Sequence, residues 1–277
     1  MAIKHIEGSN QELDATGRQR RTVLKGTGAA LTWGALASVL GVALPAGVRA
    51  ESAIGKRCLT ILYNAGPDVT FNFDYYRDNH LTMIMKLFGN SIKRFELRKP
   101  VAAAEGAPPL AFVAAINIWV NDNAAFDAGN AQHGPTMIAD IPNFTNTTAV
   151  IQNDEVWGEM GADLTSRQVG ETCMTIVYPA KEGATWNADY YRDNHMPLIM
   201  RLYTTEAISR FEIRKGIAAM DGSAPPYAGC VNFYIANQEV FAAAGAKNGQ
   251  ALRDDVPNFS TVMPIALLTD IVGVANT

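Results

Sequence analysis

The sequence predicts an α+β protein made of two tandem ferredoxin-like units, each with the element order β-α-β-β-α-β. Three observations support this fold class. The heptapeptide Asp74–His80 (DYYRDNH) recurs unchanged as Asp189–His195, 115 positions later. The segments around both copies carry strand-like and helix-like patterns in the same order. The chain of 277 residues is also 48% hydrophobic and 18% charged, which is enough apolar material for a sizeable core.

Further markers of the repeat keep nearly the same spacing. Four pairs correspond: Cys58 with Cys173, Arg94-Phe95-Glu96 with Arg210-Phe211-Glu212, Pro108-Pro109 with Pro225-Pro226, and Pro142-Asn143-Phe144 with Pro257-Asn258-Phe259. They indicate a first unit near 56–160 and a second near 171–277, joined by a polar linker around 161–170. A period this long indicates paired domains and not a solenoid.

The first unit is predicted to begin with a strand, because Cys58–Tyr63 is short, apolar and rich in β-formers. Asn72 is the expected N-cap of a helix that begins at the repeated Tyr-Tyr. The remaining elements, in order, are predicted as a second strand Arg94–Lys99, a third strand Ala111–Val120 entered through a Pro-Pro turn, a helix Ala124–Ala131 and a closing strand Thr148–Val156.

The second unit is predicted to repeat these elements. They are the strands Cys173–Tyr178, Arg210–Lys215, Tyr227–Ala236 and Met263–Val272, a first helix capped by Asn187, and a second helix Glu239–Ala246. Pro197 predicts an interruption of the first helix, where a short first turn hands over to a main helix. Thr82 takes that place in the first unit, where the helix can be continuous. One unit alone leaves a sheet face open, and two units can cover each other's.

Residues 1–50 have the form of an export signal. Arg20 and Arg21 precede an apolar stretch rich in Gly and Ala, and Val48-Arg49-Ala50 fits a signal-peptidase site. The pattern resembles a twin-arginine signal, which predicts a periplasmic or secreted protein exported by the twin-arginine machinery. The alternative is a membrane anchor that stays attached. Because this route carries folded proteins, often with a cofactor inserted, the signal also hints at a cofactor.

The charge distribution disfavours nucleic acid and anionic membrane surfaces as partners. The formal net charge is −4, but residues 51–277 hold 17 basic and 24 acidic side chains, a net of −7. Three cysteines, Cys58, Cys173 and Cys230, cannot all pair with one another, so no disulfide framework is predicted. Cys58 and Cys173 begin predicted buried strands and are interpreted as small apolar side chains.

The repeated motifs resemble the EthD family. The resemblance rests on Tyr75, Tyr76, His80 and Asp140-Ile141-Pro142-Asn143-Phe144-Thr145, and in the second unit on Tyr190, Tyr191, His195, Pro197 and Asp255-Val256-Pro257-Asn258-Phe259-Ser260. It implies the dimeric α+β barrel of that family, here made within one chain as a fused pseudo-dimer. Relatives include proteins linked to ether and aromatic breakdown and fungal dehydratase- or decarboxylase-like enzymes. Similar barrels also host cofactor-free monooxygenases and haem enzymes, so the fold does not select a chemistry.

The candidate catalytic residues are His80 and His195, with Tyr76 and Tyr191 four positions earlier on the same helical face. A histidine near neutral pKa beside a phenol can pass a proton to or from an enolisable carbon or a leaving hydroxyl. The alternative is that each pair caps the core. Asp140 and Asp255, before the Pro-Asn-Phe turn, either orient the histidines or brace the turn.

The candidate ligand-binding residues are aromatic or cationic and lie beside the histidine motif: Phe73, Tyr75, Arg77, Trp186, Tyr190 and Arg192. The aromatic rings could line an apolar pocket, although core packing explains them equally well. The two arginines could bind a substrate carboxylate, but the adjacent Asp78 and Asp193 are easier partners.

No metal site and no tightly bound cofactor are predicted. After residue 50 the only histidines are His80, His133 and His195, and none has a second histidine at helical spacing. A haem with one axial histidine stays open as an alternative. Phosphate loops, a Gly-x-Ser-x-Gly elbow and a Cys/His nucleophile pattern are missing from the sequence, which disfavours nucleotide, phosphoryl and acyl transfer.

The leading functional hypothesis is an exported acid/base enzyme, of lyase, dehydratase or isomerase type, that acts on a small apolar or aromatic oxygenated compound. The first alternative is a non-catalytic barrel that binds such a ligand. The second is a haem-binding or oxygenase-type redox enzyme. The sequence leaves open whether one or both sites work, and whether the chain is a monomeric pseudo-dimer or forms homo-oligomers.

Overall fold

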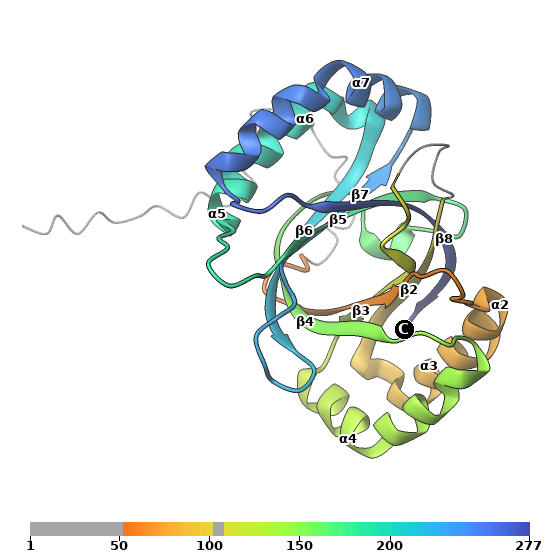
Figure 1. Ribbon diagram of the computed structural model, residues 1–277. Helices are drawn as coiled ribbons and strands as arrows, with labels where there is room; N and C mark the ends of the chain where they lie inside the picture. The colour runs from red at the N-terminus through yellow and green to blue at the C-terminus, as the bar shows by residue number, and fades with distance from the viewer. Residues whose placement is uncertain (1–51, 102–107) are drawn as a thin grey trace, which may run out of the picture. The chain divides into compact units, whose positions relative to one another are not determined.

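A computed structural model describes residues 52–101 and 108–277 (Figure 1). The predicted twin-arginine segment, with Arg20 and Arg21, lies outside these residues. Within the described ranges no helix has both the length and the apolar character needed to span a membrane.

Eight antiparallel strands form one closed barrel in the order β1-β3-β2-β8-β5-β7-β6-β4, and β4 pairs with β1 to close it (Figure 1). The first half of the chain provides β1 Arg57–Asn64, β2 Ile92–Pro100, β3 Phe112–Val120 and β4 Ala149–Gly161. The second half provides β5 Thr172–Pro179, β6 Ile208–Ala219, β7 Tyr227–Ile235 and β8 Ile265–Asn276. The halves join where β2 pairs with β8 and β4 with β6. The predicted fold class is therefore confirmed: two βαββαβ units form an intrachain α+β barrel.

Helices cover the barrel on two opposite sides (Figure 1). One side carries the first half's helical segments, which are α2 Phe73–Tyr75, a π-helical turn η1 Tyr76–Leu81, α3 Thr82–Phe88 and α4 Asn123–Asp140. The other carries α5 Ala188–Tyr190, a π-helical turn η5 Tyr191–His195, α6 Met196–Ala207 and α7 Gln238–Asp255. Short 3₁₀ turns are η2 Gly89–Ser91, η3 Ile141–Asn143, η4 Leu164–Ser166 and η6 Val256–Asn258.

The predicted N-caps are confirmed, but two helices are longer than predicted. The side chains of Asn72 and Asn187 accept hydrogen bonds from the backbone N–H groups of Tyr75 and Tyr190, both at 3.0 Å. Helices α4 and α7, predicted to end at Ala131 and Ala246, each continue for nine more residues. They pack along α3 and α6, and this tertiary packing outweighs the glycines and prolines that made the sequence pattern look broken.

The interruption predicted at Pro197 lies earlier, at the π-helical turn Tyr191–His195, and α6 runs through the proline near its start. The first half was predicted to have a continuous helix and contains the same kind of turn at Tyr76–Leu81. Because Thr82 stands there in place of the proline, the proline is not the cause of the turn.

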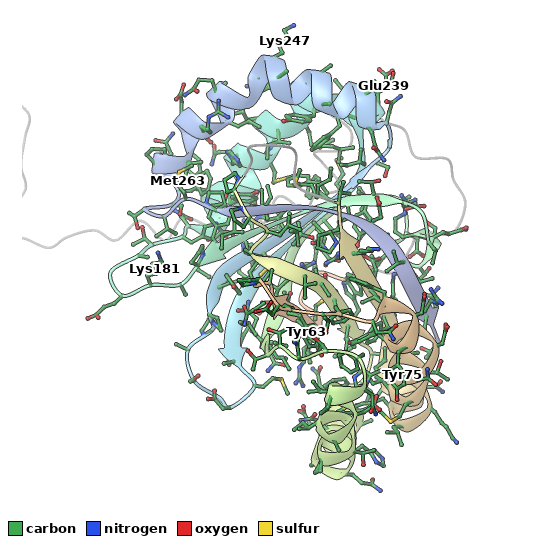
Figure 2. The ribbon with its side chains drawn as sticks, turned by 45° about the vertical axis from the view of Figure 1, so that its right-hand side comes forward. Tyr63, Tyr75, Lys181, Glu239, Lys247 and Met263 are labelled. Carbon is green, nitrogen blue, oxygen red and sulfur yellow. The ribbon has the colours of Figure 1, made fainter. Side chains whose placement is uncertain are left out.

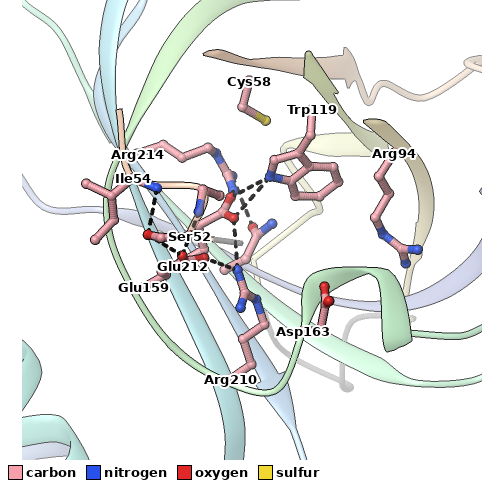
Figure 3. Close-up of polar contacts among 12 residues, drawn as sticks. Ser52, Ile54, Cys58, Arg94, Trp119, Glu159, Asp163, Arg210, Glu212 and Arg214 are labelled. Atoms are coloured by element: carbon pink, nitrogen blue, oxygen red, sulfur yellow. Dashed lines mark hydrogen bonds and ion pairs between the residues drawn. The ribbon is translucent and has the colours of Figure 1, made fainter. Parts of the chain in front are cut away.

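The barrel interior is filled by charged and polar side chains. Strand alternation puts Arg94, Glu96 and Arg98 on one face of β2, and Arg210, Glu212 and Arg214 repeat this on β6. All six are buried. Figure 3 shows Glu212 between Arg210, Arg214 and the indole of Trp119. The apolar residues between them, such as Phe95, point outward and pack under the helices, so the main hydrophobic core lies outside the barrel wall.

Candidate active site

The histidine motif is positioned by the two π-helical turns. In a π-helical turn the backbone bonds run between residues five apart, so side chains five positions apart approach the same side of the helix. Tyr75 and His80 are five apart, and both reach the carboxylate of Asp140 at the end of α4. An α-helix would point them in different directions, so the π turn builds this contact.

Asp140 gathers three donors in the first half. His80 Nδ1 lies 2.8 Å from Oδ2, the hydroxyl of Tyr75 donates to Oδ1 at 2.9 Å, and Asn143 Nδ2 donates to Oδ1 at 2.8 Å. The imidazole is 4% exposed. Tyr75 stands on the helical segment beside the sheet in Figure 2, in which Tyr63 of β1 is also labelled.

The second half repeats this arrangement. His195 Nδ1 lies 2.7 Å from Asp255 Oδ2, while Tyr190 and Asn258 donate to Oδ1 at 3.0 and 2.8 Å. The His195 side is also 4% exposed. Each half therefore contains one histidine-aspartate pair with the same supporting tyrosine and asparagine.

The electrostatics keep the aspartates ionised and the histidines neutral. Burial pushes the pKa of Asp255 upward, but the hydrogen bonds from Asn258, His195 and Tyr190 outweigh it and hold the pKa below its usual value. Asp140 behaves in the same way. Burial lowers the pKa of His195 below its ordinary value, and the neighbouring carboxylate restores only part of the loss.

These protonation states determine which imidazole nitrogen is basic. An ionised carboxylate only accepts hydrogen bonds, so Nδ1 of each histidine carries the proton and donates it to the aspartate. In the neutral ring Nε2 is then left with its lone pair. Neither Nε2 has a hydrogen-bond partner within residues 52–101 and 108–277. Each pair is thus a carboxylate-oriented base.

Aromatic rings enclose both histidines. The ring of Phe144 lies 4.7 Å from that of His80, and Phe259 lies 4.5 Å from His195. Tyr76 and Tyr191 also stack beside the histidines, at 4.8 and 5.0 Å. Burial raises the pKa of both phenols well above the ordinary value.

The two tyrosines of each motif differ in position from the expectation. Tyr76 and Tyr191 contact the histidine rings as the spacing predicted, but the structure gives their hydroxyls no hydrogen bond to the imidazole. Tyr75 and Tyr190, predicted to line a ligand pocket, instead donate to the aspartates. Asp140 and Asp255 contact the histidines directly, which is the first of the two alternatives that the sequence left open.

The structure places the remaining predicted ligand-binding residues in local contacts. Arg77 pairs with Asp78 and Asp74 at 2.7 and 3.0 Å, and Arg192 pairs with Asp193 and Asp189 at 2.7 and 3.1 Å. Phe73 packs on Phe71 with ring centroids 4.7 Å apart.

Trp186 packs between Tyr178 and Tyr191, with ring centroids 5.9 and 5.6 Å away. Its indole N–H is buried and has no hydrogen-bond partner in the described part of the chain, and the same holds for the hydroxyl of Tyr191. Two buried donors without acceptors therefore lie next to His195.

An apolar cavity of about 160 Å³ lies between the sheet and the helices of the second half. Its lining residues come from four strands and both helices: Met174, Ile176, Ile199, Tyr203, Ile208, Phe233, Phe241, Leu252 and Ala266. Ile199 and Tyr203 follow His195 at helical spacings of four and eight residues. At 1.5 Å per residue, Ile199 lies about 6 Å along the axis from the histidine.

Sequence reasoning missed three groups of residues. Asn143 and Asn258 were noted as repeat markers, and the Asp-x-Pro-Asn spacing, which puts the amide one turn after the carboxylate, could have indicated their role. Phe144 and Phe259 belong to the same motif. The buried charges inside the barrel were visible as Arg-x-Glu-x-Arg, but a strand exposed on one face would have the same pattern.

The cavity does not fit a haem. An engineered cavity of about 150 Å³ holds one benzene molecule, and a macrocycle of four linked rings needs far more space than the 160 Å³ measured here. In the described ranges no cluster of three or more His, Cys, Asp or Glu side chains could hold a metal ion.

Comparison with known proteins identifies the family. Residues 185–262 match the model of the EthD domain, a range that includes Tyr190, His195 and Asp255. The chain carries an EthD domain. The likeness of the first half to EthD rests on its repeated motifs. No curated protein matches the sequence.

Solved structures similar to this EthD protein share its fold. An anthrone oxidase-like protein aligns with a TM-score of 0.54 and 11% identity, over 83% of this chain and 95% of that one. An EthD-like protein from Ralstonia eutropha is 26% identical over 37% of this chain and 93% of its own, with a TM-score of 0.35. A dye-decolorizing peroxidase from Bacteroides thetaiotaomicron aligns with a TM-score of 0.45 and 8% identity, over 82% and 96%.

Proposed function

We propose that this EthD protein is an acid/base enzyme that moves a proton at a carbon next to a carbonyl group of a small aromatic compound. The observation that carries the proposal is the contact of 2.7 Å between His195 Nδ1 and Asp255, which leaves Nε2 as a base on the helix face that leads to an apolar cavity. Its reaction class is lyase, dehydratase or isomerase chemistry.

The proton balance of the first step is simple. Nε2 of His195 takes a proton from the carbon next to the carbonyl, and the electron pair of that C–H bond moves to the carbonyl oxygen as an enolate. The ring becomes an imidazolium, and the carboxylate of Asp255 stabilises its charge through Nδ1–H. Return of the proton to another atom gives isomerisation, while transfer to a leaving hydroxyl gives dehydration.

The aromatic enclosure supports this chemistry. A buried imidazole with a lowered pKa is unprotonated at neutral pH and available as a base. Apolar walls strengthen the interaction between imidazolium and carboxylate once the proton has moved. Tyr190 and Asn258 are positioning residues, since they hold the carboxylate and do not face the cavity lining.

A rival function, reversible binding without turnover, predicts a cavity but no role for the histidine-aspartate pairs. Export by the twin-arginine route to the periplasm, and action as a single-chain pseudo-dimer, complete the proposal. Both rest on the sequence, on the Arg20-Arg21 motif and on the repeat.

Deuterium exchange into acetophenone separates the two functions. In D₂O at neutral pH the α-methyl protons exchange slowly without a catalyst, and ¹H NMR follows their loss. The proposal predicts exchange by the wild-type protein and a loss of at least about 100-fold in the His80→Ala/His195→Ala double variant. The exposed His133→Ala variant is the matched control. Equal exchange by the double variant and the wild type would reject acid/base catalysis by these residues.

A further inference from the structure

We propose that only the second half binds the ligand, a molecule of about one aromatic ring with one oxygen acceptor, and that the first half's histidine centre is structural. The inference rests on the proposed function, because it assigns that function to the His195 centre alone. Four differences between the halves carry it.

The first difference is one residue in the cavity wall. In the second half Ala266 of β8 stands opposite Ile176 of β5. In the first half the same position on β4, opposite Ile61, holds Ile151. Isoleucine has three more side-chain carbons than alanine, and Ile151 packs against the first half's hydrophobic core. Alanine at 266 leaves that space empty beside the cavity.

The second difference is size-matched space. The counterparts of the cavity residues in the first half, among them Leu59, Ile84, Phe88 and Phe126, belong to one continuous packed cluster. The second-half lining encloses about 160 Å³, close to the roughly 150 Å³ cavity that holds benzene. The lining is hydrophobic except for the Tyr203 hydroxyl, which suits an aromatic ligand.

The third difference is the pair of unsatisfied donors. Trp186 Nε1 and the Tyr191 hydroxyl are buried without partners, which costs about 1–3 kcal/mol for each group. Phe71 takes the place of Trp186 in the first half, where the isolated bridge Phe71–Thr145 corresponds to Trp186–Ser260. A phenylalanine offers no donor. Such groups in a native protein call for an acceptor, and a ligand carbonyl oxygen supplies one.

The donors, the base and the cavity follow one another along the same two elements. On one face of β5, Met174 and Ile176 line the cavity, and the next residue on that face, Tyr178, contacts Trp186 and Tyr191. On the helix the order is His195, Ile199 and Tyr203. A ligand with its ring in the cavity therefore extends its oxygen toward the donors and passes the base.

The fourth difference is backbone strain at the end of α6. Thr204 has φ 64° and ψ 169°, a region that residues with a side chain rarely adopt. The first half has Gly89 at this position, with φ 48°. Strain of this kind persists where the surrounding structure holds it, and here it lies next to the cavity residue Tyr203.

Binding can be measured without turnover. In protein labelled with ¹³C at the methionine methyl groups, acetophenone should shift the Met174 signal, because Met174 lines the cavity. The signal of Met137, which packs on the first half's core, should stay in place. Isothermal titration should give one acetophenone per chain. Two equivalents, equal shifts at both methionines, or no shift at Met174 would overturn the proposal.

Two substitutions test the decisive wall position. Ala266→Ile should weaken acetophenone binding at least tenfold, and Ala266→Val should weaken it less while introducing less strain. Ile151→Val is the matched control in the first half and should leave the affinity unchanged. Unchanged affinity in both Ala266 variants would overturn the proposal. Because His195→Ala leaves the cavity lining intact, normal binding with unaltered exchange in that variant would reject only the proposed function.

Discussion

The side-chain amide of Asn232 donates a hydrogen bond of 3.0 Å to the side-chain oxygen of Asn117, which lies 115 positions earlier in the chain. Both residues are fully buried at the centre of the barrel. The same Asn232 accepts a hydrogen bond from Arg214 at 3.3 Å. The two halves thus meet through corresponding residues, and the buried charges of each half are satisfied only in the closed barrel.

Loss of one buried carboxylate should strongly destabilise this interior. Glu212 accepts hydrogen bonds from Arg214 at 2.7 Å and from the indole of Trp119 at 3.0 Å. Glu212→Gln should lower the free energy of unfolding by about 3–5 kcal/mol, because it leaves buried guanidinium charge uncompensated. Urea denaturation measures the change, with the exposed Glu182→Gln as control. A loss below about 1 kcal/mol would contradict this account of the interior.

Trp186 and Gly229 should prove to be a matched pair. A Cβ at Gly229 would lie 2.4 Å from the indole, while the first half combines the smaller Phe71 with Ala114 at these positions. Gly229→Ala should therefore destabilise the protein by about 1–3 kcal/mol. The double variant Trp186→Phe/Gly229→Ala should recover most of that loss in thermal denaturation. Additive losses in the double variant would show that the two positions do not interact.

The strained backbone at Thr204 predicts opposite effects in the two halves. Thr204→Gly should stabilise the protein by about 1 kcal/mol, because glycine adopts a positive φ without a steric penalty. Gly89→Thr should destabilise it by a similar amount. Chemical denaturation of both variants checks the pair. Destabilisation by Thr204→Gly would mean that the threonine side chain contributes more than its backbone costs.

Stability should fall as the pH drops below about 6.5, the ordinary value for histidine. Burial lowers the pKa of His80 and His195 in the folded state, so the unfolded chain binds more protons in this range and is favoured. Substitution of both histidines by Gln should flatten the curve between pH 7 and 6.

The lower limit of that range matters because Asp154 has the opposite sign. Burial raises its pKa to about 6, so below pH 6 the folded state gains protons at Asp154. An unchanged slope between pH 7 and 6 in the histidine variant would contradict the assignment.

Much of the fold follows from local sequence signals. The alternation in Arg94–Lys99 predicted a strand with two different faces, and the Asn72 and Asn187 caps marked the helix starts. The π-helical turns were not predictable in this way, because their i to i+5 bonds leave no distinct hydrophobic period. The lengths of α4 and α7 were missed because packing against neighbouring helices decided them.

The site was predicted in its residues more than in its contacts. His80, Asp140, His195 and Asp255 were singled out from two motifs 60 residues apart, and the structure brings them together. The exchange of roles between adjacent tyrosines depends on the π turn, which rotates Tyr75 toward the carboxylate. The cavity depends on Ala266, whose importance appears only once the strand register is known.

The most direct test of the central claim compares two single variants, His195→Ala and His80→Ala, in acetophenone deuterium exchange. If His195 is the base and the second half alone holds the ligand, His195→Ala should lose at least about 100-fold in exchange rate. His80→Ala should retain nearly the wild-type rate per folded protein. Wild-type exchange by His195→Ala would contradict the account.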